Sequence, residues 1–151
     1  MGKQKVIMLL ITYKCNLRCS YCYEPKISNF NMSFAKAKNI IQEQIEALDD
    51  EYEAVEIQFM GGEPLLEFPL IKECAKWLWS TPITDKQIML FAPTNGTLLT
   101  DDMKEWFAKN KDRIHLGLSF DGDMLCKIPI VHHHSIMLIW ISSSILGQTK
   151  A

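Results

Sequence analysis

The sequence lacks any surplus of basic residues and any long uninterrupted hydrophobic run. Its 151 residues include 16 lysines and arginines against 18 aspartates and glutamates, which gives a formal net charge of −2. A broad basic face for a nucleic-acid partner is therefore excluded. The most apolar stretch, residues 128–146, is interrupted by His132, His133, His134 and four serines. These polar residues make it a poor membrane span, so no membrane partner is expected.

Targeting signals are missing as well. The apolar run at residues 6–11 is too short for the core of a signal peptide. Val6 stands where an N-myristoylation pattern needs serine or threonine. The content of 48% hydrophobic and 23% charged residues is ordinary for a globular protein and excludes a disordered chain. We therefore expect a cytoplasmic protein of about one domain.

Cysteine is scarce and unevenly placed, which excludes a disulfide scaffold. Of the five cysteines, Cys15, Cys19 and Cys22 crowd into eight residues in a CxxxCxxC spacing. Such crowding favours a metal site in a reducing compartment. Four thiolates would complete a 4Fe–4S cluster or a structural zinc site, whereas three leave one position open to a non-protein ligand. A zinc site with three cysteines and one histidine is the alternative, but His115 and the histidine run from His132 lie far away in the sequence.

The hydrophobic pattern alternates between short strand-like runs and longer helical stretches. Strands are predicted at residues 6–11, 54–59, 87–92 and 114–119, and helices at residues 33–48, 68–79 and 100–109. Ser33 is the expected N-cap of the first helix, and Cys74 is expected in the core. The continuous apolar run of the first strand predicts burial on both faces. This order of elements favours an α/β fold with a parallel sheet or barrel and three crossover helices.

Each predicted strand is followed by a loop that is rich in glycine, asparagine, aspartate or cysteine. These loops lie at residues 15–22, 61–64, 94–96 and 121–123. In parallel α/β folds ligands bind at the carboxyl ends of the strands. We therefore expect the unusual residues of all four loops to meet on one edge of the sheet.

The cysteine loop resembles that of the radical SAM superfamily, in which an aromatic residue precedes the last cysteine. Tyr21 stands in that place. The resemblance implies that Cys15, Cys19 and Cys22 hold a 4Fe–4S cluster and that S-adenosylmethionine binds the open iron through its amino and carboxylate groups. An electron from the cluster would then cleave the sulfonium, and the resulting 5′-deoxyadenosyl radical would abstract hydrogen from a substrate.

The segment after the second predicted strand is similar to the GGEP segment of that family. It consists of Gly61, Gly62, Glu63 and Pro64. The resemblance implies that this segment meets the methionine amino group of the cofactor through backbone carbonyls and the Glu63 carboxylate. Paired glycines allow close backbone approach to a ligand, although the same residues in isolation form an ordinary turn.

Two further segments are similar to motifs of peptide-modifying members of the family. Residues 94–99 read Thr-Asn-Gly-Thr-Leu-Leu, and residues 119–122 read Ser-Phe-Asp-Gly. The resemblance implies that Asn95, Ser119 and Asp121 contact the cofactor, with Ser119 at its carboxylate or ribose. Without the resemblance, both segments read as strand-end turns built on Asn-Gly and Asp-Gly.

The residues of these motifs are most similar to the corresponding motifs of SPASM-type maturases, of which anaerobic sulfatase maturases are an example. The resemblance implies a peptide or protein substrate and a reductant such as flavodoxin or ferredoxin, and it assigns no catalytic side chain. We interpret residues 1–123 as the N-terminal part of a radical SAM partial (β/α)6 barrel, incomplete after about four strands. Residues 124–151 are interpreted as an atypical tail, frame-shifted or truncated, without helical or strand alternation. Such a half-barrel is expected to expose two strand edges and to be poorly soluble. A zinc module and a non-catalytic cluster-binding fragment are the alternative functions.

Overall fold

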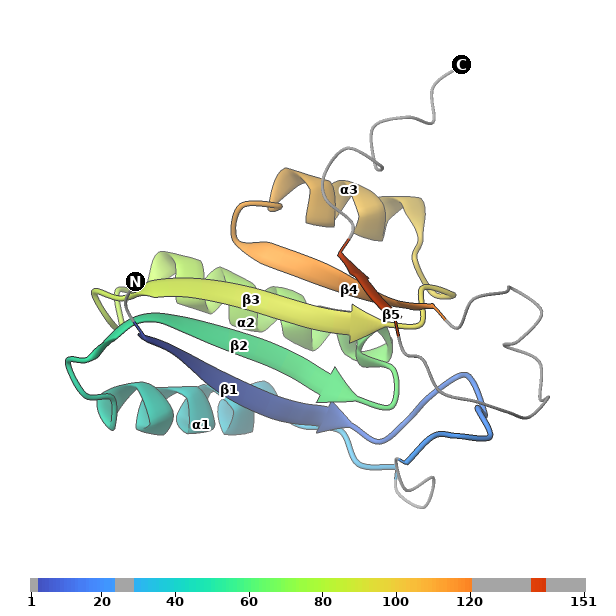
Figure 1. The fold of residues 1–151 in the computed structure, drawn as a ribbon, viewed down its shortest axis with the longest axis horizontal. Helices are drawn as coiled ribbons and strands as arrows, with labels where there is room; N and C mark the ends of the chain where they lie inside the picture. The colour runs from blue at the N-terminus through green and yellow to red at the C-terminus, as the bar shows by residue number, and fades with distance from the viewer. Residues whose placement is uncertain (1–2, 24–28, 121–136, 141–151) are drawn as a thin grey trace.

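The computed structural model describes residues 3–23, 29–120 and 137–140, with only the backbone at Phe120 and in the last segment. One sheet runs through the molecule in the order β1-β2-β3-β4-β5 (Figure 1). Its strands are β1 (Lys3–Thr12), β2 (Tyr52–Gly61), β3 (Gln87–Thr94), β4 (Ile114–Phe120) and β5 (Met137–Trp140). The helices are α1 (Phe34–Glu46), the 3-10 helix η1 (Pro64–Glu67), α2 (Phe68–Ser80) and α3 (Asp101–Lys109).

The first four strands and the three α-helices confirm the predicted α/β order. Ser33 caps α1 by accepting a hydrogen bond from the Lys36 N–H. Thr100 caps α3 in the same way, accepting from the Met103 N–H. Asp101 and Asp102 occupy the first turn of α3, where negative charge stabilises the helix dipole. Local capping chemistry therefore sets where these two helices begin.

The parallel pairing of β1 to β4 brings their carboxyl ends to one edge of the sheet. β1 pairs with β2, β2 with β3 and β3 with β4, all in parallel. The arrowheads of β1, β2 and β3 point toward the loop that follows β1, as Figure 1 shows. The expected meeting of the strand-end loops at one edge is thus built into the sheet.

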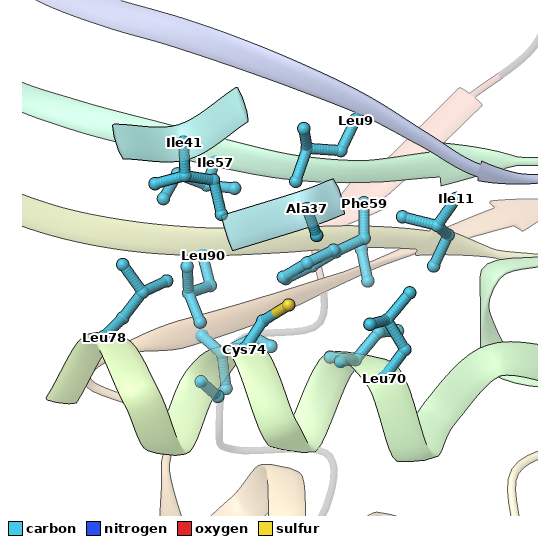
Figure 2. Close-up of a cluster of buried hydrophobic side chains, with 14 of the residues drawn as sticks. Leu9, Ile11, Ala37, Ile41, Ile57, Phe59, Leu70, Cys74, Leu78 and Leu90 are labelled. Atoms are coloured by element: carbon cyan, nitrogen blue, oxygen red, sulfur yellow. The ribbon is translucent and has the colours of Figure 1, made fainter. Parts of the chain in front are cut away.

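The core lies between one face of the sheet and the helices. Figure 2 shows Leu9 and Ile11 of β1, Ile57 and Phe59 of β2 and Cys74 of α2 in this layer. All five side chains are fully or almost fully buried, and Cys74 is a core residue as the sequence predicts. Deleting one of the larger members would cost about 2–5 kcal/mol.

The prediction that β1 is buried on both faces is wrong. Ile7, Leu9 and Ile11 are buried, but Val6 is 44% exposed and Met8 is 67% exposed. Within the described part of the chain, the helices pack on the face that carries Ile7, Leu9 and Ile11. A continuous apolar run does not show which of its two faces will find a partner, and here only one does.

The fifth strand is a second departure from the sequence prediction. Residues 137–140 pair antiparallel with β4, from Gly117 opposite Trp140 to Phe120 opposite Met137. This pairing covers the end of an edge of β4 that was expected to be exposed. Residues 136–141 are a short continuous apolar run, which periodicity alone cannot distinguish from a buried helical segment. The predicted boundary at residues 123 and 124, and the rest of the tail, lie outside the described residues.

Aromatic side chains join α2 to α3. Trp79 stacks on Trp106 with ring centroids 5.9 Å apart, and Phe68 meets Trp106 edge-on at 5.3 Å. Phe107 is buried beside them, 5.5 Å from Phe68. These rings pack helix against helix, and each such pair adds about 0.5–1.5 kcal/mol beyond its buried area.

The helices in the described ranges are α1, η1, α2 and α3. None of them combines the length and the apolar character that a membrane span requires.

The buried thiol of Cys74 predicts a loss of stability in alkali. Desolvation, with a smaller contribution from Glu73, raises the pKa of Cys74 to about 12 from 9.0. Above pH 9 the unfolded chain therefore releases a proton that the folded chain keeps, and stability falls as pH rises. Between pH 8 and pH 10.5 the contribution of Cys74 to the free energy of unfolding should fall by about 2 kcal/mol.

Urea unfolding of the wild type and of Cys74→Val at both pH values measures this effect. Valine has no proton to lose, so the variant should lose about 2 kcal/mol less than the wild type across the same interval, whatever its stability at pH 8. An equal loss in both proteins would contradict the assignment.

Candidate functional site

The loop that carries the three cysteines is fixed at both ends to the end of β1. The Ile11 carbonyl accepts from the Met32 N–H at 2.8 Å, and the Tyr13 N–H donates to the Phe30 carbonyl at 3.3 Å. The buried Thr12 hydroxyl lies 2.9 Å from Asn31 Oδ1. The outgoing and returning chains are thereby held side by side, so the cysteines start from a fixed base.

Within this loop the three thiols form no disulfide and are partly accessible. Cys15 is exposed, while Cys19 and Cys22 are half-buried, and none forms a disulfide. A turn closed by the Cys22 N–H and the Cys19 carbonyl, 3.2 Å apart, brings the last two together. In the described ranges no three His, Cys, Asp or Glu side chains converge tightly enough to hold a single metal ion.

The surroundings of Cys15 disfavour its thiolate when no cation is bound. Desolvation by the neighbouring loops raises the pKa of the Cys15 thiol above its ordinary value. The Leu17 N–H, 3.4 Å from the sulfur, acts in the opposite direction. The negative charges of Glu63, Cys19 and Cys22 raise this pKa further. A cationic centre bound by the thiolates would compensate this concentration of negative charge.

The paired glycines pack directly against the backbone of the cysteine loop. The Gly62 N–H donates to the Thr12 carbonyl at 3.0 Å. A Cβ atom at Gly61 would lie 2.2 Å from the Thr12 carbonyl oxygen, and one at Gly62 would lie 2.4 Å from that of Lys14. No side chain can be accommodated at such distances from backbone atoms. The two glycines are therefore required by contact within the chain itself, before any ligand is considered.

Glu63 connects this segment to the loops on either side. Its backbone N–H donates to the Lys14 carbonyl at 2.8 Å, on the cysteine loop. Its carboxylate accepts from the Thr94 hydroxyl at 2.7 Å and from the Asn95 N–H at 2.8 Å, on the loop after β3. A third donor is the Leu65 N–H at 3.0 Å, which caps η1. Glu63 is only 1% exposed, so these hydrogen bonds are what makes its burial tolerable.

Asn95 links the loop after β3 to the cysteine loop. Its side-chain amide donates to Asn16 Oδ1 at 3.0 Å and to the Cys15 sulfur at 4.0 Å. The Asn16 amide in turn donates to the Thr97 hydroxyl at 2.7 Å. That hydroxyl donates to Asn95 Oδ1 at 2.6 Å. The three side chains thus form a closed ring of hydrogen bonds that spans two loops.

The remaining predicted site residues are placed less centrally. Tyr21 is 57% exposed, and Pro64 is buried as the first residue of η1. Ser119 is half-buried near the end of β4, one residue after Leu118, which pairs with Thr94 of β3. Asp121 lies outside the described residues.

Four polar residues of the site were not singled out from the sequence. They are Thr12, Asn16, Thr94 and Thr97, all in strand-end loops or at strand ends. Two of them, Thr12 and Thr94, are buried polar residues at the last position of a parallel strand. That position next to a motif is the signal that could have identified them.

These features define a class of protein: a parallel α/β fold with a loop of three cysteines that form no disulfide. The loop lies at the carboxyl edge of the sheet and is hydrogen-bonded to the loops after the second and third strands. The model of the radical SAM superfamily matches residues 9–129. The chain belongs to the radical SAM superfamily.

Several curated proteins are similar to this chain. An uncharacterised protein of Methanocaldococcus jannaschii is 37% identical over 118 residues, which cover 78% of this chain and 39% of that protein. A cysteine-type anaerobic sulfatase-maturating enzyme of Clostridium novyi is 29% identical over 113 residues, covering 72% and 30%. A GTP 3′,8-cyclase of Campylobacter jejuni is 31% identical over 128 residues, covering 79% and 35%. The chain thus spans between 30% and 39% of the length of these relatives.

Solved structures share the fold. The structure described as native anSMEcpe with bound AdoMet and Kp18Cys peptide superposes with a TM-score of 0.68 at 21% identity. The match covers 82% of this chain and 33% of that one. The parallel sheet with its helices therefore matches part of the radical SAM barrel, as the sequence predicts.

The close approach of Gly62 to the cysteine loop predicts a large effect of one methyl group. Gly62→Ala should destabilise the chain by about 2 kcal/mol or more, because the new Cβ meets a backbone oxygen that cannot move aside. Gly117→Ala is the matched control, since its Cβ would meet the far end of the Phe91 ring at 2.6 Å. A ring can turn away, so the control should lose less. Urea unfolding compares the two, and an equal or smaller loss in Gly62→Ala would contradict the packing argument.

Proposed function

We propose that this chain binds a 4Fe–4S cluster through Cys15, Cys19 and Cys22 and binds S-adenosylmethionine beside it. One observation carries the proposal: the loop with the three cysteines, none of them in a disulfide, is hydrogen-bonded to the loops after β2 and β3 at the carboxyl edge of the sheet. When bound, these groups supply reductive cleavage of the sulfonium and a 5′-deoxyadenosyl radical that abstracts hydrogen from a substrate.

The donor set fits a cluster better than a zinc ion. Thiolates on one zinc ion at about 2.3 Å must approach one another to roughly 3.8 Å. The described side chains form no such convergent group, whereas cysteines on a cluster each bind a different iron. No histidine completes a zinc site in the described ranges either. These features support the cluster over the zinc module.

The residues of the chain itself have separable tasks in this proposal. The cysteine loop holds the cluster, and Gly61 and Gly62 allow the neighbouring backbone to pack against that loop. Glu63 fixes the segment whose backbone would meet the cofactor amino group, and direct contact of its carboxylate with that group stays a prediction of the family resemblance. Ser119 lies on the same edge and is proposed to bind the cofactor carboxylate or ribose. Tyr21, Pro64 and Asp121 complete the set of proposed cofactor contacts.

For the substrate we propose a peptide or protein segment, as in SPASM-type maturases. The sulfatase-maturating relative and the structural neighbour with a bound peptide support this class. The similarity to a GTP 3′,8-cyclase shows that the same segment also serves other chemistry. A reductant such as flavodoxin or ferredoxin and a cytoplasmic location belong to the proposal as well.

Anaerobic reconstitution with iron and sulfide tests the cluster. The chain should become brown and retain about four irons. Cys15→Ala, Cys19→Ala and Cys22→Ala should each lose the cluster spectrum. Cys74→Ala is the matched control and should keep it, because Cys74 is buried in the core.

Two outcomes would contradict this assignment. Retention of about four irons by Cys19→Ala would show that the loop does not supply the ligands. A colourless chain that binds zinc instead would favour the zinc module. Release of 5′-deoxyadenosine from S-adenosylmethionine under a strong reductant then separates an active enzyme from a non-catalytic cluster-binding fragment.

Ser119 offers the test of the cofactor site. Ser119→Ala should keep the cluster but weaken S-adenosylmethionine binding about tenfold. The substitution would leave the cofactor's carboxylate or ribose without its hydrogen-bond partner, and a polar group left unpaired on burial costs about 1–3 kcal/mol. Glu63 is less suitable because its carboxylate also holds the loops together. Calorimetry on the reconstituted chain, with Ser80→Ala at the end of α2 as control, measures the affinity. Unchanged affinity in Ser119→Ala would show that Ser119 does not contact the cofactor and is an ordinary residue near the end of a strand.

A further inference from the structure

The Asn95 side chain has no hydrogen-bonding capacity left for a cofactor. A side-chain amide offers two N–H donors and two acceptor positions on its oxygen. The donors of Asn95 go to Asn16 Oδ1 and to the Cys15 sulfur. Its oxygen accepts from the Thr97 N–H at 2.9 Å and from the Thr97 hydroxyl at 2.6 Å. All four positions are therefore used by contacts within the chain.

The ring formed with Asn16 and Thr97 also has a defined direction. Asn16 donates to Thr97, Thr97 donates to Asn95, and Asn95 donates back to Asn16. Hydrogen bonds arranged in such a chain polarise and strengthen one another. The backbone under Asn95 is fixed as well, because its N–H donates to the buried Glu63 carboxylate. The ring is thus supported by Glu63 on one side and contacts Cys15, a proposed cluster ligand, on the other.

We propose that Asn16, Asn95 and Thr97 form an amide clamp that positions Cys15 as a cluster ligand and directs the Asn95 N–H at its sulfur. This inference deepens the proposed function and rests on it for the identity of the cluster. It changes the role expected for Asn95 from cofactor contact to positioning residue. It also adds Asn16 and Thr97, for which neither spacing nor resemblance indicated a role.

The clamp has a chemical consequence for the bound cluster. Hydrogen bonds to cluster-ligating sulfurs help to set the reduction potential. Cys15 has two N–H donors near its sulfur, the Leu17 backbone at 3.4 Å and the Asn95 side chain at 4.0 Å. Both stabilise added negative charge. Loss of the clamp should therefore make the cluster harder to reduce.

Two variants remove the clamp and two serve as controls. Thr97→Val removes the hydroxyl that closes the ring with little change in size, and Asn16→Ala removes its neighbour. Thr97→Ser keeps the hydroxyl and should restore the wild-type behaviour. Asn39→Ala deletes the same kind of side chain from the exposed face of α1, away from the site.

The first measurement is amide hydrogen exchange in the metal-free chain. Exchange in the peptide covering residues 13–23 should be about three- to tenfold faster in Thr97→Val and Asn16→Ala than in the wild type. Thr97→Ser and Asn39→Ala should exchange as the wild type does. The second measurement is a redox titration of the reconstituted chains followed by electron paramagnetic resonance. The midpoint potential of the clamp variants should shift to more negative values while their iron content is retained.

The outcomes separate the clamp from the proposed function. Unchanged exchange in Thr97→Val and Asn16→Ala overturns the clamp, whether or not iron binds. Faster exchange with an unchanged potential overturns the directed N–H···S contact and with it the proposal. A wild-type chain that binds no iron overturns the proposed function instead, and the exchange data identify that case because they need no metal.

Discussion

The buried carboxylate of Glu63 is the interaction on which the rest of the site depends. It receives hydrogen bonds from Leu65, Thr94 and Asn95, while its own N–H reaches the Lys14 carbonyl on the cysteine loop. One residue therefore joins the loops that follow three successive strands. Burial strengthens these hydrogen bonds. It also makes the loss of any one of them destabilising, because a carboxylate taken out of water needs its hydrogen-bond donors. The loops consequently have one relative arrangement.

A parallel sheet brings strand ends together, but it does not by itself arrange the loops beyond them. Here β1, β2 and β3 supply the convergence, and short backbone contacts supply the arrangement. The glycine pair allows the loop after β2 to lie against Thr12 and Lys14. The cysteine loop is thus held by the neighbouring loops near Lys14 and Cys15, and by its own hydrogen bonds at its base and at the turn between Cys19 and Cys22.

Much of this fold could be predicted from the sequence because its elements carry local signals. Helical spacing predicted α1 and α3, with Ser33 as the cap of α1, and the cysteine spacing predicted the three residues that are proposed to hold a cluster. The exposure of Met8 and the antiparallel strand β5 could not be predicted, since both depend on which partner reaches an apolar segment. The ring of Asn16, Asn95 and Thr97 could not be predicted for a similar reason. Asn16 lies about 80 positions from the other two residues, and no local sequence pattern indicates that they meet.

That separation along the chain also sets an order of events. The contacts of Asn16 with Thr97 and Asn95 close loops of 81 and 79 residues, which can form only after β1, β2 and β3 have paired. Contacts of such high sequence separation are slow to form because the loop entropy is lost before they are made. In a zinc finger the metal drives folding, whereas this site is completed by folding. A chain released from the ribosome would therefore complete the contacts between its strand-end loops last, and insertion of the proposed cluster would select the molecules that have finished folding.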